Sequence, residues 1–254
     1  MDCICTRKRE TTVERMTMIL MKNALRLPGL WLTLCRHARH PEKYPEEVRY
    51  GHIRHAFQLA VKTGNIDLQV FGKENIPTDE PFMMYPNHQG KFDPIPIVAS
   101  CDVPMGVVMK KELLEHPALR LIAQSTKSFG MDRENVRQSL TVINAVIDEL
   151  KKGRSYVLFP EGEANRCTNE VGSFHSGSFR CAVKTHCTVV PVALIDSFKP
   201  MDYPGTDPVT VQVHFLKPIP YAQYQGMNPT ELATLVRQRI VDAIALHTGA
   251  ATVQ

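Results

Sequence analysis

Short apolar segments alternate with helical patterns along most of the chain, and this alternation limits the fold more than any other feature of the sequence. The apolar segments have the length of strands and lie at 66–71, 82–85, 106–109, 155–159, 188–195 and 209–216. Helical patterns lie beside them, at 46–63, 94–101, 112–124, 135–152, 177–186 and after Pro229. Strands that alternate with helices form βαβ units, whose sheet is buried on both faces. The sequence therefore predicts an α/β fold with a largely parallel β-sheet flanked by helices.

The charge of the chain is uneven along its length. The 254 residues are 43% hydrophobic and 22% charged, as in a globular protein with a core of its own. Residues 1–62 hold 12 Lys and Arg against 6 Asp and Glu, whereas residues 63–254 hold 18 against 20. We therefore predict a basic, amphipathic helical segment (1–62) followed by an α/β domain (63–254), and the basic end is the part suited to an acidic surface.

The N-terminal segment is predicted to form two short amphipathic helices, separated at Pro28-Gly29. On the first helix, one face is apolar and the other cationic: Val13, Met16, Leu20, Ala24 and Leu27 against Arg15, Lys22 and Arg26. The second contains Trp31, the single tryptophan of the chain. No apolar run approaches the roughly 18 residues of a spanning helix, and we expect no secretory signal. The pattern suits an interfacial membrane anchor, and it equally suits a helical pair that packs on the domain.

His88 and Asp93 are the candidate catalytic residues. His88 lies in the loop between the 82–85 strand and a helix predicted to begin at Pro94, with Asp93 at its N-cap. Five residues on one helix would separate the two side chains, but a loop can fold back so that the carboxylate meets the imidazole. A carboxylate on one ring nitrogen fixes the tautomer and makes the other nitrogen a general base for a hydroxyl. The alternative is a capping aspartate beside an ordinary loop histidine.

A second strand and loop carries the sequence Tyr-Val-Leu-Phe-Pro-Glu-Gly at 156–162. Asn87, His88 and Asp93 match an Asn-His-x4-Asp motif, and Phe159 to Gly162 match a Phe-Pro-Glu-Gly motif. With these motifs in this order, residues 66–220 resemble the glycerolipid acyltransferase superfamily. The resemblance is closest to the bacterial 1-acyl-sn-glycerol-3-phosphate (lysophosphatidic acid) acyltransferases.

The resemblance implies transfer of a fatty acyl group from acyl-CoA or acyl carrier protein to the sn-2 hydroxyl of lysophosphatidic acid. His88 would be the general base and Asp93 its orienting carboxylate. No cofactor or metal is expected, because the thiol is a good leaving group and the substrate supplies the nucleophile. The implied partners include an anionic membrane surface at the cytoplasmic face of the cell membrane, and no nucleic acid. The seven cysteines lack Cys-x-x-Cys spacing, which indicates reduced thiols and no zinc site.

The substrate phosphate requires cations near His88, and the resemblance points to several positions. The candidates are Arg133, Arg166, Glu161, Gly162, Lys110 and Lys111. Of these, Arg133 lies between a short apolar segment and a helix, a suitable place for a bidentate grip. The alternative for each cation is a solvated surface position, and for Glu161 it is a salt bridge that shapes its loop.

The chain departs from the family pattern on the anion side of the predicted site. Position 164 is alanine where the family has arginine, so Arg166 is the nearest replacement, and His175 stands where lysine is common. Three other functions therefore stay open. The first is acyl transfer to glycerol 3-phosphate or another lysophospholipid. The others are hydrolysis, for which the Gly-x-Ser-x-Gly elbow is missing, and lipid binding without catalysis.

Overall fold

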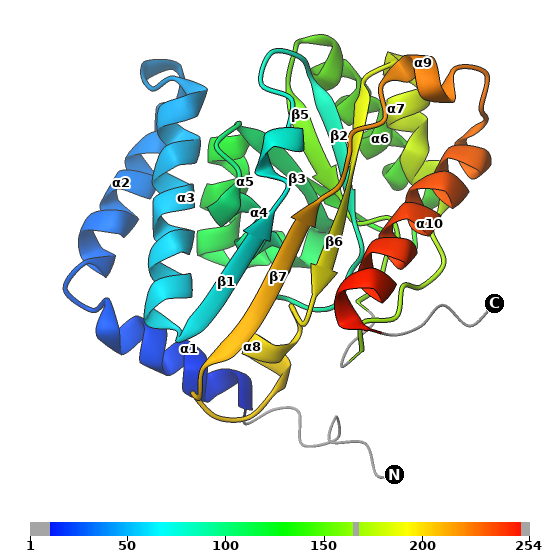
Figure 1. Ribbon diagram of the computed structural model, residues 1–254. Coiled ribbons are helices and arrows are strands. Elements are labelled where there is room, and N and C mark those ends of the chain that lie inside the picture. Colours follow the sequence, from blue (N-terminus) through cyan, green and yellow to red (C-terminus); the bar gives the residue numbers. More distant parts are fainter. Residues whose placement is uncertain (1–10, 165–167, 250–254) are drawn as a thin grey trace.

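The computed structural model describes residues 11–164 and 168–249, and within them seven strands form one sheet (Figure 1). The strands are β1 (Ile66–Phe71), β2 (Phe82–Pro86), β3 (Met105–Lys110), β4 (Phe129–Met131), β5 (Ser155–Leu158), β6 (Thr188–Ile195) and β7 (Val209–Phe215). Their order across the sheet is β1-β7-β6-β2-β5-β3-β4. The central strands β2, β5 and β6 therefore end at one edge of the sheet, side by side.

The pairing confirms a largely parallel sheet, with one antiparallel pair between β6 and β7. All other neighbours, including β1 with β7, pair in parallel. A parallel neighbour needs a long crossover, whereas β7 follows β6 after the short helix α8 (Lys199–Asp202) and can return directly. The edge strand β1 and its neighbour β7 consequently run opposite to the other five.

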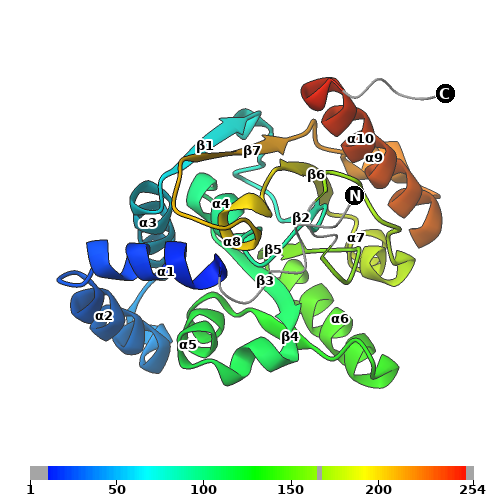
Figure 2. The same cartoon turned by 90° about the horizontal axis from the view of Figure 1, so that it is seen from below.

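Helices cover both faces of the sheet (Figure 2). The longer ones are α1 (Thr11–Lys22), α2 (Leu27–Arg39), α3 (Glu46–Thr63), α5 (Pro117–Thr126), α6 (Val136–Lys151) and α10 (Pro229–Thr248). The shorter ones are α4 (Pro94–Ser100), α7 (Arg180–Thr185), α9 (Tyr221–Tyr224) and the 3₁₀ turns Pro41–Lys43, Lys73–Asn75, Lys111–Glu115 and Ser176–Phe179. One face packs on α3, α4 and α5, and the other on α6, α7 and α10.

Strand β2 shows how the alternation of side chains builds both cores. Phe82 and Met84 point into the core beneath α3 and α4, while Met83 and Tyr85 point into the core beneath α6 and α10. All four side chains are fully buried. A strand that is apolar on both faces can occupy only the middle of such a sheet, so its end, where His88 follows, is held firmly.

Helix α1 packs on the domain partly through polar side chains. The sequence predicted that Arg15 lies on an outer cationic face, and the structure differs from this prediction. The buried Arg15 donates from Nη1 to the carbonyl of Gly64 at 2.6 Å and from Nη2 to that of Asp207 at 2.8 Å. Asn23 is buried as well and donates to Thr63 Oγ1 at 2.8 Å. Two apolar residues of this helix, Leu20 and Met21, face solvent, whereas Ile19 lies against the domain beside Ile66 and Phe92.

The predicted helix break is wrong by a few residues. The first helix ends at Lys22, a turn covers 23–26, and Pro28 lies in the first turn of α2, where a missing N–H costs nothing. In the part of the chain that the structure describes, none of the helices combines the length and apolar character needed to cross a bilayer. The division of the chain at residue 62 stays a prediction.

Candidate active site

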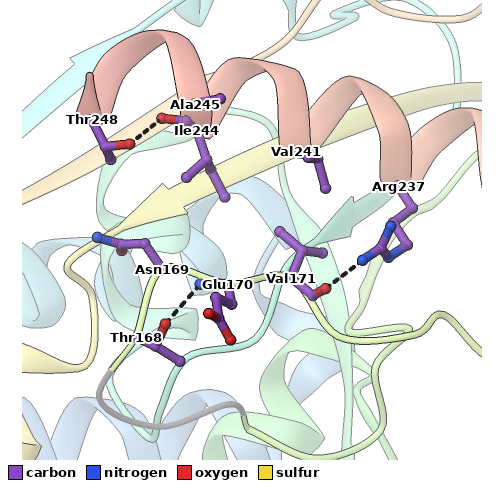
Figure 3. A pocket seen from close by; sticks show the side chains of 9 residues that line it. All are labelled: Thr168, Asn169, Glu170, Val171, Arg237, Val241, Ile244, Ala245 and Thr248. Atoms are coloured by element: carbon purple, nitrogen blue, oxygen red, sulfur yellow. Dashed lines mark hydrogen bonds between the residues drawn. The ribbon is translucent and has the colours of Figure 1, made fainter. Parts of the chain in front are cut away.

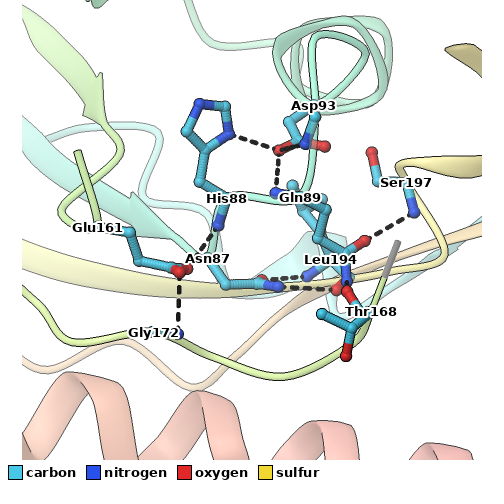
Figure 4. Close-up of polar contacts among 10 residues, drawn as sticks. Asn87, His88, Gln89, Asp93, Glu161, Thr168, Gly172, Leu194 and Ser197 are labelled. Atoms are coloured by element: carbon cyan, nitrogen blue, oxygen red, sulfur yellow. Dashed lines mark hydrogen bonds and ion pairs between the residues drawn. The ribbon is translucent and has the colours of Figure 1, made fainter. Parts of the chain in front are cut away.

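His88 and Asp93 meet in the loop that joins β2 to α4. His88 Nδ1 and Asp93 Oδ2 are 2.7 Å apart (Figure 4), which is the contact that the loop spacing predicts. The expected capping role of Asp93 is wrong. Asp93 holds the N-cap position of α4, but its side chain makes no cap hydrogen bond because it turns back into the loop.

The carboxylate of Asp93 is fully buried, and one of its oxygens gathers the loop around it. Besides the imidazole, Oδ2 accepts the peptide N–H of Gln89 at 2.6 Å and that of Gly90 at 2.9 Å. Three donors on one oxygen offset the cost of burying its charge. An ionised carboxylate can only accept, so His88 Nδ1 carries the hydrogen and Nε2 keeps its lone pair.

The imidazole of His88 is held from a second side by an aromatic ring. Its ring centre lies 4.5 Å from that of Phe159, which follows β5. The His88 side chain is 17% exposed, and Figure 4 shows its second ring nitrogen pointing away from Asp93. The pair therefore presents one oriented, accessible acceptor nitrogen at the carboxyl edge of the sheet, where α/β proteins bind their ligands.

Asn87 ends the ladder between β2 and β6 with its side chain. Its Nδ2 donates to the Leu194 carbonyl at 3.0 Å, and its Oδ1 accepts the Leu194 N–H at 2.7 Å. The amide thus replaces one residue of a strand, and the main chain is free to leave the sheet. The hydrogen bonds of the Asn87 side chain thus fix the place where β2 ends and the loop with His88 begins.

Glu161 bridges the catalytic loop and a later segment. Its Oε1 accepts the His88 N–H at 2.7 Å, and its Oε2 accepts the Gly172 N–H at 2.9 Å. Burial raises the pKa of the Glu161 carboxyl, and these two N–H donors partly oppose that shift. Gly162 follows with φ +79°, a conformation that suits glycine, and a β-carbon there would lie 3.1 Å from the His175 ring. Glu161 thus links the backbone of His88 to that of Gly172 inside the candidate site.

A neutral amide network on the other side of the loop was missed by the sequence reasoning. Gln89 Oε1 accepts the Ser197 N–H at 2.8 Å, and its Nε2 donates to Asn169 Oδ1 at 2.7 Å. Asn169 in turn accepts the N–H of Asp196 at 2.9 Å. The fully buried Gln89 thereby joins the loop to the ends of two other segments. Its only sequence signal is its place beside His88.

Arg133 lies between β4 and α6, at the same edge of the sheet. Dehydration by the surrounding protein lowers the pKa of its guanidinium, and the carboxylates of Glu163 and Glu112 oppose this shift. The side chain is exposed, and it makes no ion pair within 4 Å with any residue that the structure describes. Its charge therefore faces solvent near Glu163, which follows the Phe-Pro-Glu-Gly stretch.

The two lysines of the predicted anion site are paired with carboxylates. Lys110 Nζ is 3.8 Å from Glu112 Oε2, and Lys111 bonds to Asp132. Both side chains are about half exposed. Arg166 lies outside the described residues. The phosphate-binding roles of all these side chains, and of Glu161 and Gly162, stay predictions.

A cavity of about 490 Å³ lies between α10 and residues 168–171 (Figure 3). Neither His88 nor Asp93 lines it, so the polar network at the sheet edge marks the candidate active site better than this cavity does. Within residues 11–164 and 168–249, no three His, Cys, Asp or Glu side chains are grouped as metal ligands would be.

Comparison with known proteins agrees with the motifs and the fold. A family model described as "Acyltransferase" matches residues 67–195, which include both β-strand loops of the site. The chain belongs to the acyltransferase family. The predicted resemblance is thereby confirmed at the level of the family, and with it the assignment as an enzyme.

Individual relatives and one solved structure extend the comparison. The chain is 25% identical over 194 residues to a 1-acyl-sn-glycerol-3-phosphate acyltransferase of Borreliella burgdorferi, covering 74% of this chain and 76% of that one. It is 28% identical over 160 residues to the enzyme of that name from Salmonella typhimurium, covering 63% and 65%. The crystal structure of the 1-acyl-sn-glycerophosphate acyltransferase PlsC from Thermotoga maritima matches with TM-score 0.70 and 20% identity, covering 94% and 98%.

The hydrogen bonds of Asp93 predict that some variants lose only acyl-transfer activity, whereas others also lose stability. His88→Ala and Asp93→Asn should each lower the rate of acyl transfer by about 10³-fold or more, because the base is lost or misoriented. Asp93→Ala should in addition lower the free energy of unfolding by about 1–3 kcal/mol, because the N–H groups of Gln89 and Gly90 lose their acceptor. Steady-state kinetics and urea denaturation measure the two effects. Near-normal turnover of His88→Ala would contradict the assignment of the base.

Proposed function

We propose that the protein is a 1-acyl-sn-glycerol-3-phosphate acyltransferase. It transfers a fatty acyl group from acyl-CoA or acyl carrier protein to the sn-2 hydroxyl of lysophosphatidic acid and forms phosphatidic acid. The observation that carries the proposal is the 2.7 Å hydrogen bond between His88 and the buried Asp93, which leaves Nε2 as an oriented acceptor. The names of the relatives from Borreliella and Salmonella support this choice of substrate.

In this mechanism His88 acts as a general base. Nε2 takes the proton of the sn-2 hydroxyl as the oxygen attacks the thioester carbonyl, and Asp93 stabilises the imidazolium that forms. The carbon–sulfur bond then breaks, and the imidazolium returns the proton to the departing thiolate. The substrate supplies the nucleophile and the donor supplies the leaving group, so the step requires neither a protein nucleophile nor a metal.

Release of the thiol tests this function directly. With acyl-CoA as donor, we expect free CoA to appear rapidly when lysophosphatidic acid is added, and slowly without an acceptor. Glycerol 3-phosphate and lysophosphatidylcholine distinguish other acceptors, and fast release into water alone would indicate a hydrolase. Absence of release with every acceptor, using both acyl-CoA and acyl carrier protein, would contradict the proposal and favour a lipid-binding protein.

Arg133 is the strongest candidate for binding the substrate phosphate. It lies at the catalytic edge of the sheet, and its charge is not taken up by an ion pair within the described residues. Lys110 and Lys111 are already paired with Glu112 and Asp132, which makes them weaker candidates. A guanidinium binds a phosphate monoester through two parallel hydrogen bonds, which a lysine does not provide.

We therefore expect Arg133→Ala to raise the KM for lysophosphatidic acid by about 10- to 100-fold, the equivalent of losing a hydrogen bond to a charged group. The KM for the acyl thioester should change little, because only the acceptor carries the monoester. Arg137→Ala is the matched control, because Arg137 lies in the first turn of α6 and is also exposed. Equal changes in both KM values would assign Arg133 to the donor or to the loop.

The orientation of α1 and α2 supports contact with a membrane surface. Large apolar side chains are exposed along α1, the turn after it and α2: Met16, Leu20, Met21, Leu25, Trp31 and Leu32. Leu25 is 99% exposed and Met21 74% exposed. A helix that uses Arg15 and Asn23 to bind its own domain leaves this apolar surface for another apolar phase. We propose a peripheral contact with the cytoplasmic face of the cell membrane.

The surface defined by these six side chains predicts a specific loss of binding. Leu25→Asp should weaken co-sedimentation with vesicles of anionic phospholipid by about tenfold or more, because a buried leucine contributes about 1.5–3 kcal/mol. Leu246→Asp on α10 is the matched control, since Leu246 is also an exposed apolar residue. High salt should release part of the wild-type protein by screening its basic residues. Equal binding of both variants would place the contact elsewhere.

A further inference from the structure

Arg237 on α10 holds two consecutive carbonyl groups of the loop beside the active site. Its Nε donates to the Gly172 carbonyl and its Nη2 to the Val171 carbonyl, both at 2.7 Å. Figure 3 shows the bond to Val171. The half-buried guanidinium is planar and presents its donors in a fixed arrangement. It therefore sets the orientation of the peptide bond between Val171 and Gly172.

That peptide bond carries the constraint from α10 to the active site. The carbonyl of Val171 and the N–H of Gly172 belong to one planar trans unit, so they point in opposite directions. With the carbonyl held by Arg237, the N–H is aimed at Glu161 Oε2, 2.9 Å away. The other oxygen of Glu161 accepts the N–H of His88 at 2.7 Å. Three successive hydrogen bonds thus join Arg237 to the backbone of His88.

The loop passes close to the carboxylate of Glu161 at Gly172. A β-carbon on Gly172 would lie 2.7 Å from Glu161 Oε2, closer than such atoms approach. Glu161 itself is buried, with 8% of its surface exposed. A displaced 171–172 peptide must therefore either move the carboxylate or break its bond to Gly172.

We propose that Arg237 is a positioning residue that acts on His88 through Gly172 and Glu161. The proposal rests on the proposed function of His88 as the general base. Arg237 is occupied by the loop carbonyls, so its effect falls on the geometry of the base and not on substrate affinity. A small displacement of a catalytic group is enough to slow the chemical step strongly.

Steady-state kinetics of Arg237→Ala with acyl-CoA and lysophosphatidic acid tests the proposal. We expect kcat to fall by about tenfold to 100-fold while both KM values stay within about threefold. Arg237→Lys restores a donor for one carbonyl and should recover part of the rate. Arg239→Ala is the matched control, because Arg239 lies on the same helix and bonds to Lys217 and Gln223 away from the loop. Its kcat should equal that of the wild type.

A double-mutant cycle with Glu161→Gln identifies the route of the effect. If Arg237 acts through Glu161, Arg237→Ala should lower kcat by less than about threefold in the Glu161→Gln background. The proposal would be overturned if the kcat losses of Arg237→Ala and Glu161→Gln multiplied in full in the double variant. A wild-type kcat in Arg237→Ala would overturn it too. If Arg237→Ala does not fold, Gly172→Ala tests the same route with Arg237 intact, and an unchanged kcat there would overturn it as well. An inactive wild type would instead contradict the proposed function.

Discussion

One carboxylate oxygen, Asp93 Oδ2, determines the geometry of the catalytic loop. It accepts hydrogen bonds from the imidazole of His88 and from the peptide N–H groups of Gln89 and Gly90. A fully buried charge is tolerated only where donors surround it, so the loop must close around this oxygen for the protein to be stable. The closure that stabilises the carboxylate also directs the second nitrogen of His88 outward. Stability and orientation of the base therefore have the same cause at this position.

The closed loop is in turn fixed to a rigid frame. Asn87 bonds to Leu194 on β6, Gln89 bonds to the segment after β6, and Glu161 bonds from the segment after β5. These strands are neighbours of β2 in a sheet covered on both faces, so their ends move little relative to each other. Asn87, His88 and Gln89 thus each have a partner outside the loop. Such a support holds the imidazole of His88 in one orientation.

The sequence predicted the long, strongly patterned elements and the His88–Asp93 contact, because both follow from local chemistry. It missed β4, whose three residues are too few to show an alternating pattern. It missed the role of Gln89, because a neutral amide in a loop has no periodicity and its partner Asn169 is 80 residues away. It also assigned Arg15 to an outer cationic face, although this side chain is buried against main-chain carbonyls. Backbone carbonyls leave no mark in a sequence, so such a partner can be seen only in the folded chain.

The hydrogen bonds between the Asn87 side chain and the Leu194 backbone determine when the loop with His88 can reach its final structure during folding. The two residues are 107 positions apart, so the loop that carries His88 lacks one of its anchors until β6 has been added to the sheet. Contacts between such distant segments form late, because a long stretch of chain must be ordered first. During synthesis, the histidine leaves the ribosome well before the strand that fixes it. A nascent chain that ends before residue 194 therefore contains both His88 and Asp93 but not the completed candidate site.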